Sequence, residues 1–332
     1  MNIEVPVASA RRVAPVWRRA LPVIGLGLLA WVLSRLDLGA LGRALGRVSV
    51  STLGLSCGWF MLNLWLKVWR WQRLLLAQGI VVQHRVALAA FLSAQFYAQV
   101  TVGRVGEFVR IEALIERGVG TGTALSSCIF DRLLDVFLVL FAGSVLGALV
   151  LGDARTALAA ASVLFALALL AALFLNMLGR APSQGQADWV QRLLERYRER
   201  PLVSRLVGGL RELARGMLPM LRARTLLEAA LWTLLAWSGY FAALFALADG
   251  LHLDVTRVLL TATAAFAALS ALLPVTISGL GARELIYIQV LQAQGVANES
   301  AVALSLLHLI VMSVTAIVLG LIGTAWRQRQ RA

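Results

Sequence analysis

Charged side chains interrupt an otherwise apolar sequence at a few places, and their types and spacing suit anion binding. In VTVGRVGEFVRIE, residues 100–112, Arg104 and Glu107 follow a stretch, 86–103, that carries no charge. A planar guanidinium group binds phosphate through paired hydrogen bonds, and a nearby carboxylate can orient it or exchange a proton. We therefore predict a site for a phosphate-bearing group, with these substrate-binding residues: Arg104, Glu107, Arg110, Arg132, Arg283 and Glu284.

A second stretch, PVTISGLGARELIY, begins at Pro274 and has the same form. Glycines after an apolar half-helix let the chain turn and leave backbone N–H groups free to meet a ligand. The predicted turn glycines are Gly103, Gly106, Gly279 and Gly281. The alternative is that each glutamate pairs with a nearby arginine only to hold its turn.

A third cluster opens a long apolar segment, in FDRLLDVF. Asp131 and Asp135 are four residues apart and share a helix face, and Arg132 precedes Asp135 by three. We expect this cluster to clip the first glycine turn in place or to contact substrate directly. Gln95 and Gln99 also share a face, where their amides would contribute to gating or to hydrogen bonds between helices.

The composition places these residues in a membrane. The chain of 332 residues is 60% hydrophobic and 14% charged, with a mean hydropathy of +0.80. A span needs roughly 20 apolar residues. Segments of that length occur at 124–152, 156–178, 225–248, 257–277 and 301–325, and shorter ones at 21–36 and 48–66.

Arginine-rich links set the orientation. The link 178–224 holds ten arginines against four acids, and both termini are basic, so all three are expected to be cytoplasmic. Lys67 and Arg70, among tryptophans that include Trp71, are interpreted as an interface belt. A single full crossing at 86–102 would contradict these signals, so 86–122 is predicted to be a re-entrant hairpin. By the same reasoning 257–297 is predicted to be a re-entrant hairpin or a pair of helices that crosses and returns, and both segments should lie beside a polar cavity.

The two hairpins resemble each other at one offset of 177 residues: Glu107 and Gly118 match Glu284 and Gly295. The prediction is therefore an all-α polytopic membrane protein with about six full spans and two re-entrant hairpins in an inverted repeat. Residues 1–332 form one membrane domain, with half 1 at 48–178, half 2 at 225–325, and a basic cytoplasmic amphipathic loop at 179–224.

Signatures of soluble catalysis are missing from the sequence. It contains no HExxH, Walker, GxSxG or complete GxGxxG motif, so we expect a protein that is not an enzyme. Cys57, Cys128 and the three histidines lack metal-ligand spacing, which predicts neither a metal nor a cofactor. The net charge of +14 lies in the links between apolar runs, which argues against a nucleic-acid partner.

Taken in order, GRVGEFVR, DRLLD and PVTISGLGARE resemble the flippase-like membrane domain of lysylphosphatidylglycerol synthases, including stand-alone members similar to hopanoid-biosynthesis-associated membrane proteins. The resemblance covers about residues 15–325 and implies a helical domain that moves a lipid between leaflets. The family's turns map onto Gly103, Arg104, Gly106 and Glu107, and onto Gly281, Arg283 and Glu284; its acidic cluster maps onto Asp131, Arg132 and Asp135. Here Val102 replaces a usual proline and Asp131 a usual glutamate, and the synthase's aminoacyl-transferring domain is missing.

The leading hypothesis is a transporter of an anionic phospholipid or polyprenyl-linked lipid in a bacterial-type cytoplasmic (inner) membrane. Its partner would be a membrane lipid with a phosphate-bearing headgroup. Two alternatives differ in class: a membrane enzyme that changes a lipid without moving it, and a scaffold that recruits lipid-synthesis enzymes as partners.

Overall fold

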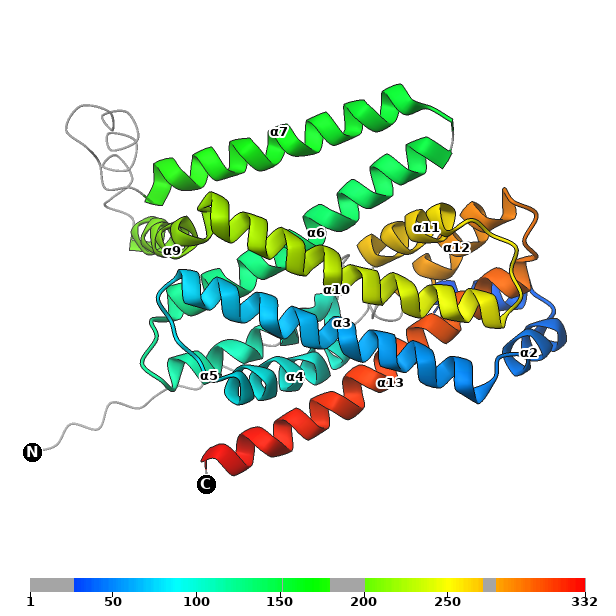
Figure 1. Cartoon of the computed structure of the whole chain (residues 1–332), viewed down its shortest axis with the longest axis horizontal. Helices are drawn as coiled ribbons and strands as arrows, with labels where there is room; N and C mark the ends of the chain where they lie inside the picture. Colours follow the sequence, from blue (N-terminus) through cyan, green and yellow to red (C-terminus); the bar gives the residue numbers. More distant parts are fainter. Residues whose placement is uncertain (1–26, 151, 180–200, 271–278, 332) are drawn as a thin grey trace, which may run out of the picture.

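The structure, a computed structural model, describes residues 27–150, 152–179, 201–270 and 279–331. Helices dominate these residues (Figure 1). Their backbone N–H and C=O groups are paired inside each helix, which is the requirement that hydrocarbon imposes on a spanning segment. The longer helices are α3 (Val50–Ala77), α4 (His84–Val100), α6 (Thr121–Val150), α7 (Ala154–Gly179), α9 (Pro201–Met217), α10 (Ala223–Gly250), α11 (Arg257–Ser270), α12 (Ala282–Gln292) and α13 (Asn298–Arg331).

Shorter elements complete the described chain. Helix α2 (Leu38–Gly46) precedes α3, and the two helices are bent by 78° relative to each other. Asp37 caps the first turn of α2. The 3₁₀ helix η1 (Val102–Ile111) and α5 (Glu112–Ile115) follow α4, and the 3₁₀ helix η2 (Leu218–Leu221) follows α9. Residues 27–34 are also helical, within the shorter apolar segment at 21–36.

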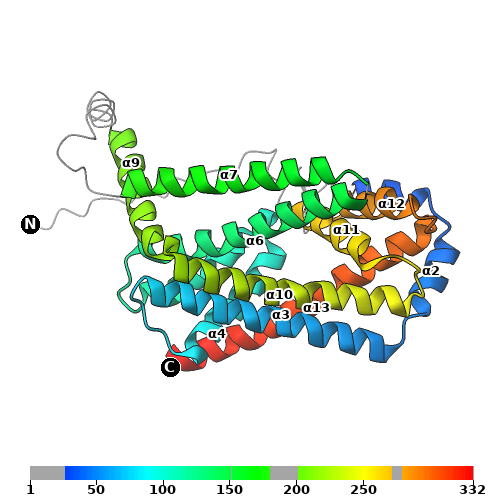
Figure 2. The ribbon, with the colours of Figure 1, turned by 45° about the horizontal axis from the view of Figure 1, so that its top comes forward.

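Four of the described helices, α6, α7, α10 and α13, are long and apolar enough to cross a membrane, and a fifth span results if α2 and α3 count as one bent span. Helix α7 lies at the edge of the bundle (Figure 2), and its apolar side chains, such as Leu158 and Phe165, face outward with 70% and 68% exposure. A contiguous apolar surface of this kind suits lipid. The protein is thus a multi-pass membrane protein.

Helices α3 and α10 form an antiparallel pair through the middle of the bundle (Figure 2). Asn63 donates to the carbonyl of Ala236 at 2.6 Å, and Ser56 donates to the carbonyl of Ala243 at 3.1 Å. Gly239 allows the close approach, because a Cβ there would lie 3.0 Å from the backbone oxygen of Trp59. Polar links between helices matter in an apolar bundle, where lipid contacts compete with apolar packing.

The segment from α4 to α5 leaves one end of the bundle and returns to it. Helix α4 stops at Thr101, and η1 packs back along it because Gly106 has no side chain to meet the backbone of Tyr97. Gln78, just after α3, contacts the first turns of α6 through Ser126 Oγ at 2.8 Å. The chain thus enters and leaves hairpin 1, residues 84–120, at the same end.

Helices α11 and α12 form the second hairpin, residues 257–297, at the opposite end of the bundle (Figure 1). Arg257, at the start of α11, pairs with Asp249 at the end of α10 at 2.7 Å. Leu291 and Val302, on either side of the turn into α13, belong to one core cluster with Leu251. Residues 271–278, with the predicted PVTIS segment, lie outside the described residues.

Each hairpin packs on a long helix from the other half of the chain: α4 on α13, and α11 on α6. The α13 contact is the tighter, because a Cβ at Gly320 would lie 2.8 Å from the backbone N of Phe96. At Gly143 of α6 the nearest atoms to a Cβ would belong to side chains, the ring of Phe266 at 3.4 Å and the Cβ of Ala265 at 3.6 Å. Helices α4 and α13 are therefore clamped, in the sense that their backbones are in close contact at Gly320. Helices α11 and α6 contact each other at Gly143 through side chains.

The two glycines provide a matched stability test. Gly320→Ala places a methyl group against backbone that cannot move aside, so we expect the free energy of unfolding to fall by about 1–3 kcal/mol. Gly143→Ala has room and gains helix propensity, so its stability should be unchanged or slightly higher. Thermal unfolding of the detergent-purified variants measures both, and equal melting temperatures for the two would contradict the clamp.

Candidate functional site

A pocket lies between α4 and η1 of hairpin 1, α11 and α12 of the second hairpin, and helices α3, α6, α10 and α13. Its empty space is about 990 Å³, including the part open to the outside. Apolar and aromatic side chains such as Phe60 and Tyr240 form much of its wall. The charged residues that line it are Lys67, Arg104, Glu107, Arg110, Asp131, Arg132, Asp135 and Arg283.

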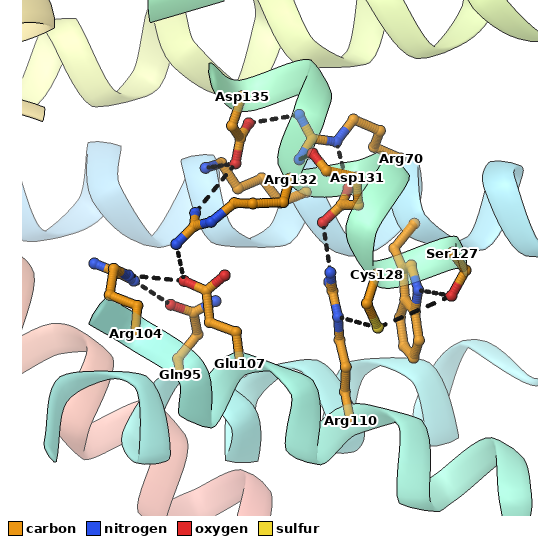
Figure 3. Close-up of polar contacts among 12 residues, drawn as sticks. Arg70, Gln95, Arg104, Glu107, Arg110, Ser127, Cys128, Asp131, Arg132 and Asp135 are labelled. Atoms are coloured by element: carbon orange, nitrogen blue, oxygen red, sulfur yellow. Dashed lines mark hydrogen bonds and ion pairs between the residues drawn. The ribbon is translucent and has the colours of Figure 1, made fainter. Parts of the chain in front are cut away.

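Arg70 is the centre of the inner part of this site, although its side chain is 0% exposed. Its Nε donates to Asp131 at 2.7 Å, and its Nη1 donates to Asp135 at 2.7 Å and to Thr233 at 3.0 Å (Figure 3). Two carboxylates one helical turn apart match the fork of one guanidinium. The interaction ties α3 to α6 and α10.

Arg110 attaches hairpin 1 to the same carboxylates. It donates to Asp131 Oδ2 at 2.8 Å and to the sulfur of Cys128 at 3.1 Å (Figure 3). Its guanidinium also lies over the rings of Trp71 and Phe91, at 4.9 and 5.0 Å from their centroids. These contacts attach Arg110, and with it hairpin 1, to Asp131, which is the clipping role considered for that residue.

Asp135 is shared more widely than its spacing predicted. Besides Arg70, it accepts from Lys67 Nζ at 2.9 Å and from the indole of Trp237 at 2.9 Å. The Lys67 ammonium also lies 5.0 Å from the centre of the Trp237 ring. Asp135 is thus a structural hub, with its oxygens directed at α3 and α10.

A second group of charges lies nearer the opening. Arg104 Nε and Arg132 Nη2 both donate to the same oxygen of Glu107, each at 2.8 Å (Figure 3). Gln95 accepts from Arg104 Nη2 at 3.2 Å, and Arg132 lies 3.8 Å from Asp135. The side chains of Arg104 and Arg132 are 23% and 26% exposed. One carboxylate oxygen therefore serves two partly open arginines.

The second hairpin supplies Arg283, and no described carboxylate is within ion-pair distance of it. Its Nε donates to Ser305 at 3.1 Å and its Nη2 to His308 Nδ1 at 2.9 Å. Glu284 lies outside the pocket lining and is fully buried: it accepts from Ser305 at 3.0 Å and from the backbone N–H of Gly281 at 2.6 Å. Glu284 holds its turn, in agreement with the alternative role considered for it.

The turns differ from the expected glycine geometry. In the first, the left-handed residue is Arg104 itself, with φ 57°, whereas in the second Gly279 and Gly281 have φ 82° and 84°. The backbone N–H of Gly106 donates to Thr101 Oγ1 at 2.8 Å, so neither it nor that of Gly281 is free for a ligand. Gly103 lies within η1. The expectation of free N–H groups was wrong at these two positions.

The structure thus brings Arg104, Glu107, Arg110, Arg132 and Arg283 to one pocket. Gln95 and Gln99 line its wall. The interface-belt interpretation of Lys67, Arg70 and Trp71 was wrong, because α3 continues to residue 77 and buries Arg70 and Trp71 completely.

Sequence reasoning missed Lys67, Arg70, Trp237 and His308 as parts of the site. One signal was available for Lys67 and Arg70: their i, i+3 spacing puts two cations on one helix face, which matches the two carboxylates that Asp131 and Asp135 place on one face of another helix. Among the described residues no group of three His, Cys, Asp or Glu side chains is arranged to hold a metal ion.

The Arg70 cluster yields a stability prediction. Arg70→Met leaves Asp131 and Asp135 short of a cation in a buried setting, so we expect a loss of about 3–5 kcal/mol. The matched control is Arg224→Met, because Arg224 is 91% exposed in its pair with Glu228 and should contribute little. Chemical or thermal unfolding in detergent compares the two; similar stability would rule out the cluster as a structural hub.

Comparison with known proteins agrees with this architecture. A search of curated proteins found no match. The family model described as the lysylphosphatidylglycerol synthase TM region matches residues 20–320, nearly the whole chain and all of the pocket. The chain therefore belongs to the lysylphosphatidylglycerol synthase transmembrane-region family.

Proposed function

We propose that the protein is a flippase-like transporter that moves an anionic phospholipid or polyprenyl-linked lipid between leaflets by passing its headgroup through the pocket. One observation carries the proposal: the pocket is lined by five cations and three carboxylates, a formal surplus of two positive charges. A phosphate-bearing headgroup supplies the missing negative charge, while its apolar tails remain in lipid.

The arginines nearest the opening are suited to exchange partners. Arg104 and Arg132 compete for one oxygen of Glu107, so each retains donors that a phosphate can engage. Arg283, on the other hairpin, donates to neutral acceptors, Ser305 and His308, in the part of the chain that the structure describes. An incoming phosphate would bridge Arg283 to the arginines of hairpin 1 and draw those arginines from Glu107.

An inverted repeat supports movement rather than static binding. Arg104 in the first turn and Gly281, one of two residues with positive φ in the second, are separated by 177 residues, the same offset as Gly118 and Gly295. Helices α6 and α13 begin at Thr121 and Asn298, again 177 apart. In transporters, opposed repeats with broken helices at their interface form the substrate site and exchange between inward and outward openings.

The proposed topology follows from the same geometry. Hairpin 1 opens toward the end of α3 and the start of α6, and hairpin 2 opens toward the opposite end. With the arginine-rich link on the cytoplasmic side, hairpin 1 is re-entrant from the cytoplasm and hairpin 2 from the outside. Both termini are then cytoplasmic in a bacterial-type inner membrane.

A membrane enzyme is the second candidate, because the family name refers to a synthase. It predicts that purified protein converts a lipid into a new chemical species. A scaffold for lipid-synthesis enzymes is the third, and it predicts that the pocket charges can be replaced without loss of function. Transport predicts relocation of an unchanged lipid and dependence on those charges.

Removing a headgroup cation tests the proposal directly. In proteoliposomes holding fluorescent phosphatidylglycerol, Arg104→Gln and Arg283→Gln should each slow headgroup translocation about tenfold or more, since a charge-assisted hydrogen bond contributes about 1.5–3 kcal/mol. Arg257→Gln, at the outer ion pair with Asp249, is the control that should leave the rate unchanged. Wild-type rates in both pocket variants would exclude these arginines from transport.

Glu107 provides a prediction with two readouts. Glu107→Gln weakens the acceptor that competes with phosphate, so headgroup binding should tighten severalfold while translocation slows because release is harder. Titration with short-chain phosphatidylglycerol and the liposome assay measure the two effects separately, with Glu228→Gln, outside the pocket lining, as the control. Weaker binding in Glu107→Gln would show that Glu107 orients the arginines instead of competing for them.

A further inference from the structure

His308 is a buried histidine in contact with the pocket arginine of hairpin 2. It lies on α13, is 0% exposed, and its Nδ1 is 2.9 Å from Arg283 Nη2. Its Nε2 is buried and has no hydrogen-bond partner among the described residues. A buried polar atom without a partner is rare in native proteins and calls for an explanation.

The contact with Arg283 determines where the imidazole proton lies. A guanidinium has five N–H donors and no acceptor, so His308 Nδ1 must accept. The ring is therefore neutral in this state and carries its proton on Nε2. Protonation would place a donor on Nδ1 against the Arg283 N–H and would set two cations side by side.

The surroundings of His308 contain few other groups that could influence its charge. From α12, Arg283 and the hydroxyl of Tyr287, 3.4 Å from Nδ1, face it; from α10, the ring of Tyr240 packs edge-on at 4.8 Å. Glu284 reaches this cluster only through Ser305, which accepts from Arg283 and donates to Glu284. Arg283 is thus the dominant charge at the imidazole.

Arg283 also differs from the other lining arginines. Arg104, Arg110 and Arg132 each pair with a carboxylate, whereas the hydrogen-bond partners of Arg283 among the described residues are the Ser305 hydroxyl and His308. A phosphate that binds Arg283 would neutralise the cation beside the imidazole. The cost of protonating His308 then falls.

We propose that His308 is a positioning residue that links proton uptake to headgroup binding through Arg283. The inference rests on the transport function proposed above. When phosphate binds, His308 accepts a proton at Nδ1, can no longer accept from Arg283, and releases the guanidinium N–H toward the phosphate. The new Nδ1–H has the hydroxyl oxygen of Tyr287 as its nearest acceptor, and proton loss restores the Arg283 contact and favours headgroup release.

The sign of the linkage follows from this order of events. Bound phosphate raises the proton affinity of His308, so by reciprocity proton binding raises the affinity for phosphate. Headgroup binding should therefore tighten as the pH falls, with up to one proton taken up per headgroup. A phosphodiester keeps one negative charge across this range, so its own ionisation does not produce the effect.

Calorimetry of the purified full chain measures the linkage. Dihexanoyl phosphatidylglycerol is titrated in buffers of different ionisation enthalpy, which gives the number of protons taken up on binding. We expect a clear fraction of one proton for the wild type, and a value near zero for His308→Asn. The asparagine carbonyl replaces Nδ1 as acceptor for Arg283 and cannot be protonated, so binding itself should persist.

A matched control and a variant-free measurement complete the test. His252→Asn makes the same exchange at an exposed residue with φ 54°, a conformation that asparagine tolerates, and should keep the wild-type proton count. Nitrogen NMR of labelled histidine in the wild type should show His308 as the neutral Nε2–H form without lipid and protonated with it. This second measurement holds even if His308→Asn fails to fold.

The outcomes separate the two proposals. If the wild type does not bind dihexanoyl phosphatidylglycerol at any pH, the transport proposal fails for this headgroup, and the linkage fails with it. If it binds, but His308→Asn takes up as many protons as the wild type, or His308 keeps one protonation state with and without lipid, the linkage is overturned while the transport proposal remains.

Discussion

The bundle depends on how Asp131 and Asp135 are neutralised. Both carboxylates project from α6 into the protein interior, where an unpaired charge is severely unfavourable. Arg70 from α3 and Arg110 from η1 bind Asp131, and Arg70 and Lys67 bind Asp135. Because these cations come from separate elements, pairing the two acids also sets the relative positions of α3, α6 and hairpin 1.

The inner cluster determines what remains available outside it. Three cations, Lys67, Arg70 and Arg110, occupy Asp131 and Asp135, so Glu107 is left to serve Arg104 and Arg132. Arg283 adds a further positive charge from the other hairpin. Outside the inner cluster, three lining arginines therefore share one lining carboxylate, Glu107, and two of these arginines, Arg104 and Arg132, lie at the partly exposed side of the pocket, while the fully buried side is structural. This division explains how one pocket can be both a packing hub and a candidate anion site.

The sequence predicted the helical class, the long apolar segments and the approach of Arg104 to Glu107, because these depend on composition and on residues near each other in the chain. It misplaced Lys67 and Arg70, because tryptophans beside cations are also typical of a membrane interface. Burial separates the two cases, and burial depends on α6 and α10 packing against α3. His308 was missed for the same reason: its partner Arg283 lies 25 residues away across a turn.

The two halves match in the positions of their turns but differ in charge chemistry and packing. Hairpin 1 is held by ion pairs to α6 and clamped by backbone contact at Gly320. In hairpin 2, Arg283 donates to the neutral side chains of Ser305 and His308. Helix α11 of this hairpin contacts Gly143 of α6 through the ring of Phe266. Ion pairs and backbone contacts resist displacement of a hairpin more strongly than hydrogen bonds to neutral side chains and contact with a ring that can rotate. Under the transport proposal, hairpin 1 would therefore stay with the bundle as the reference, and hairpin 2 would carry the larger movement.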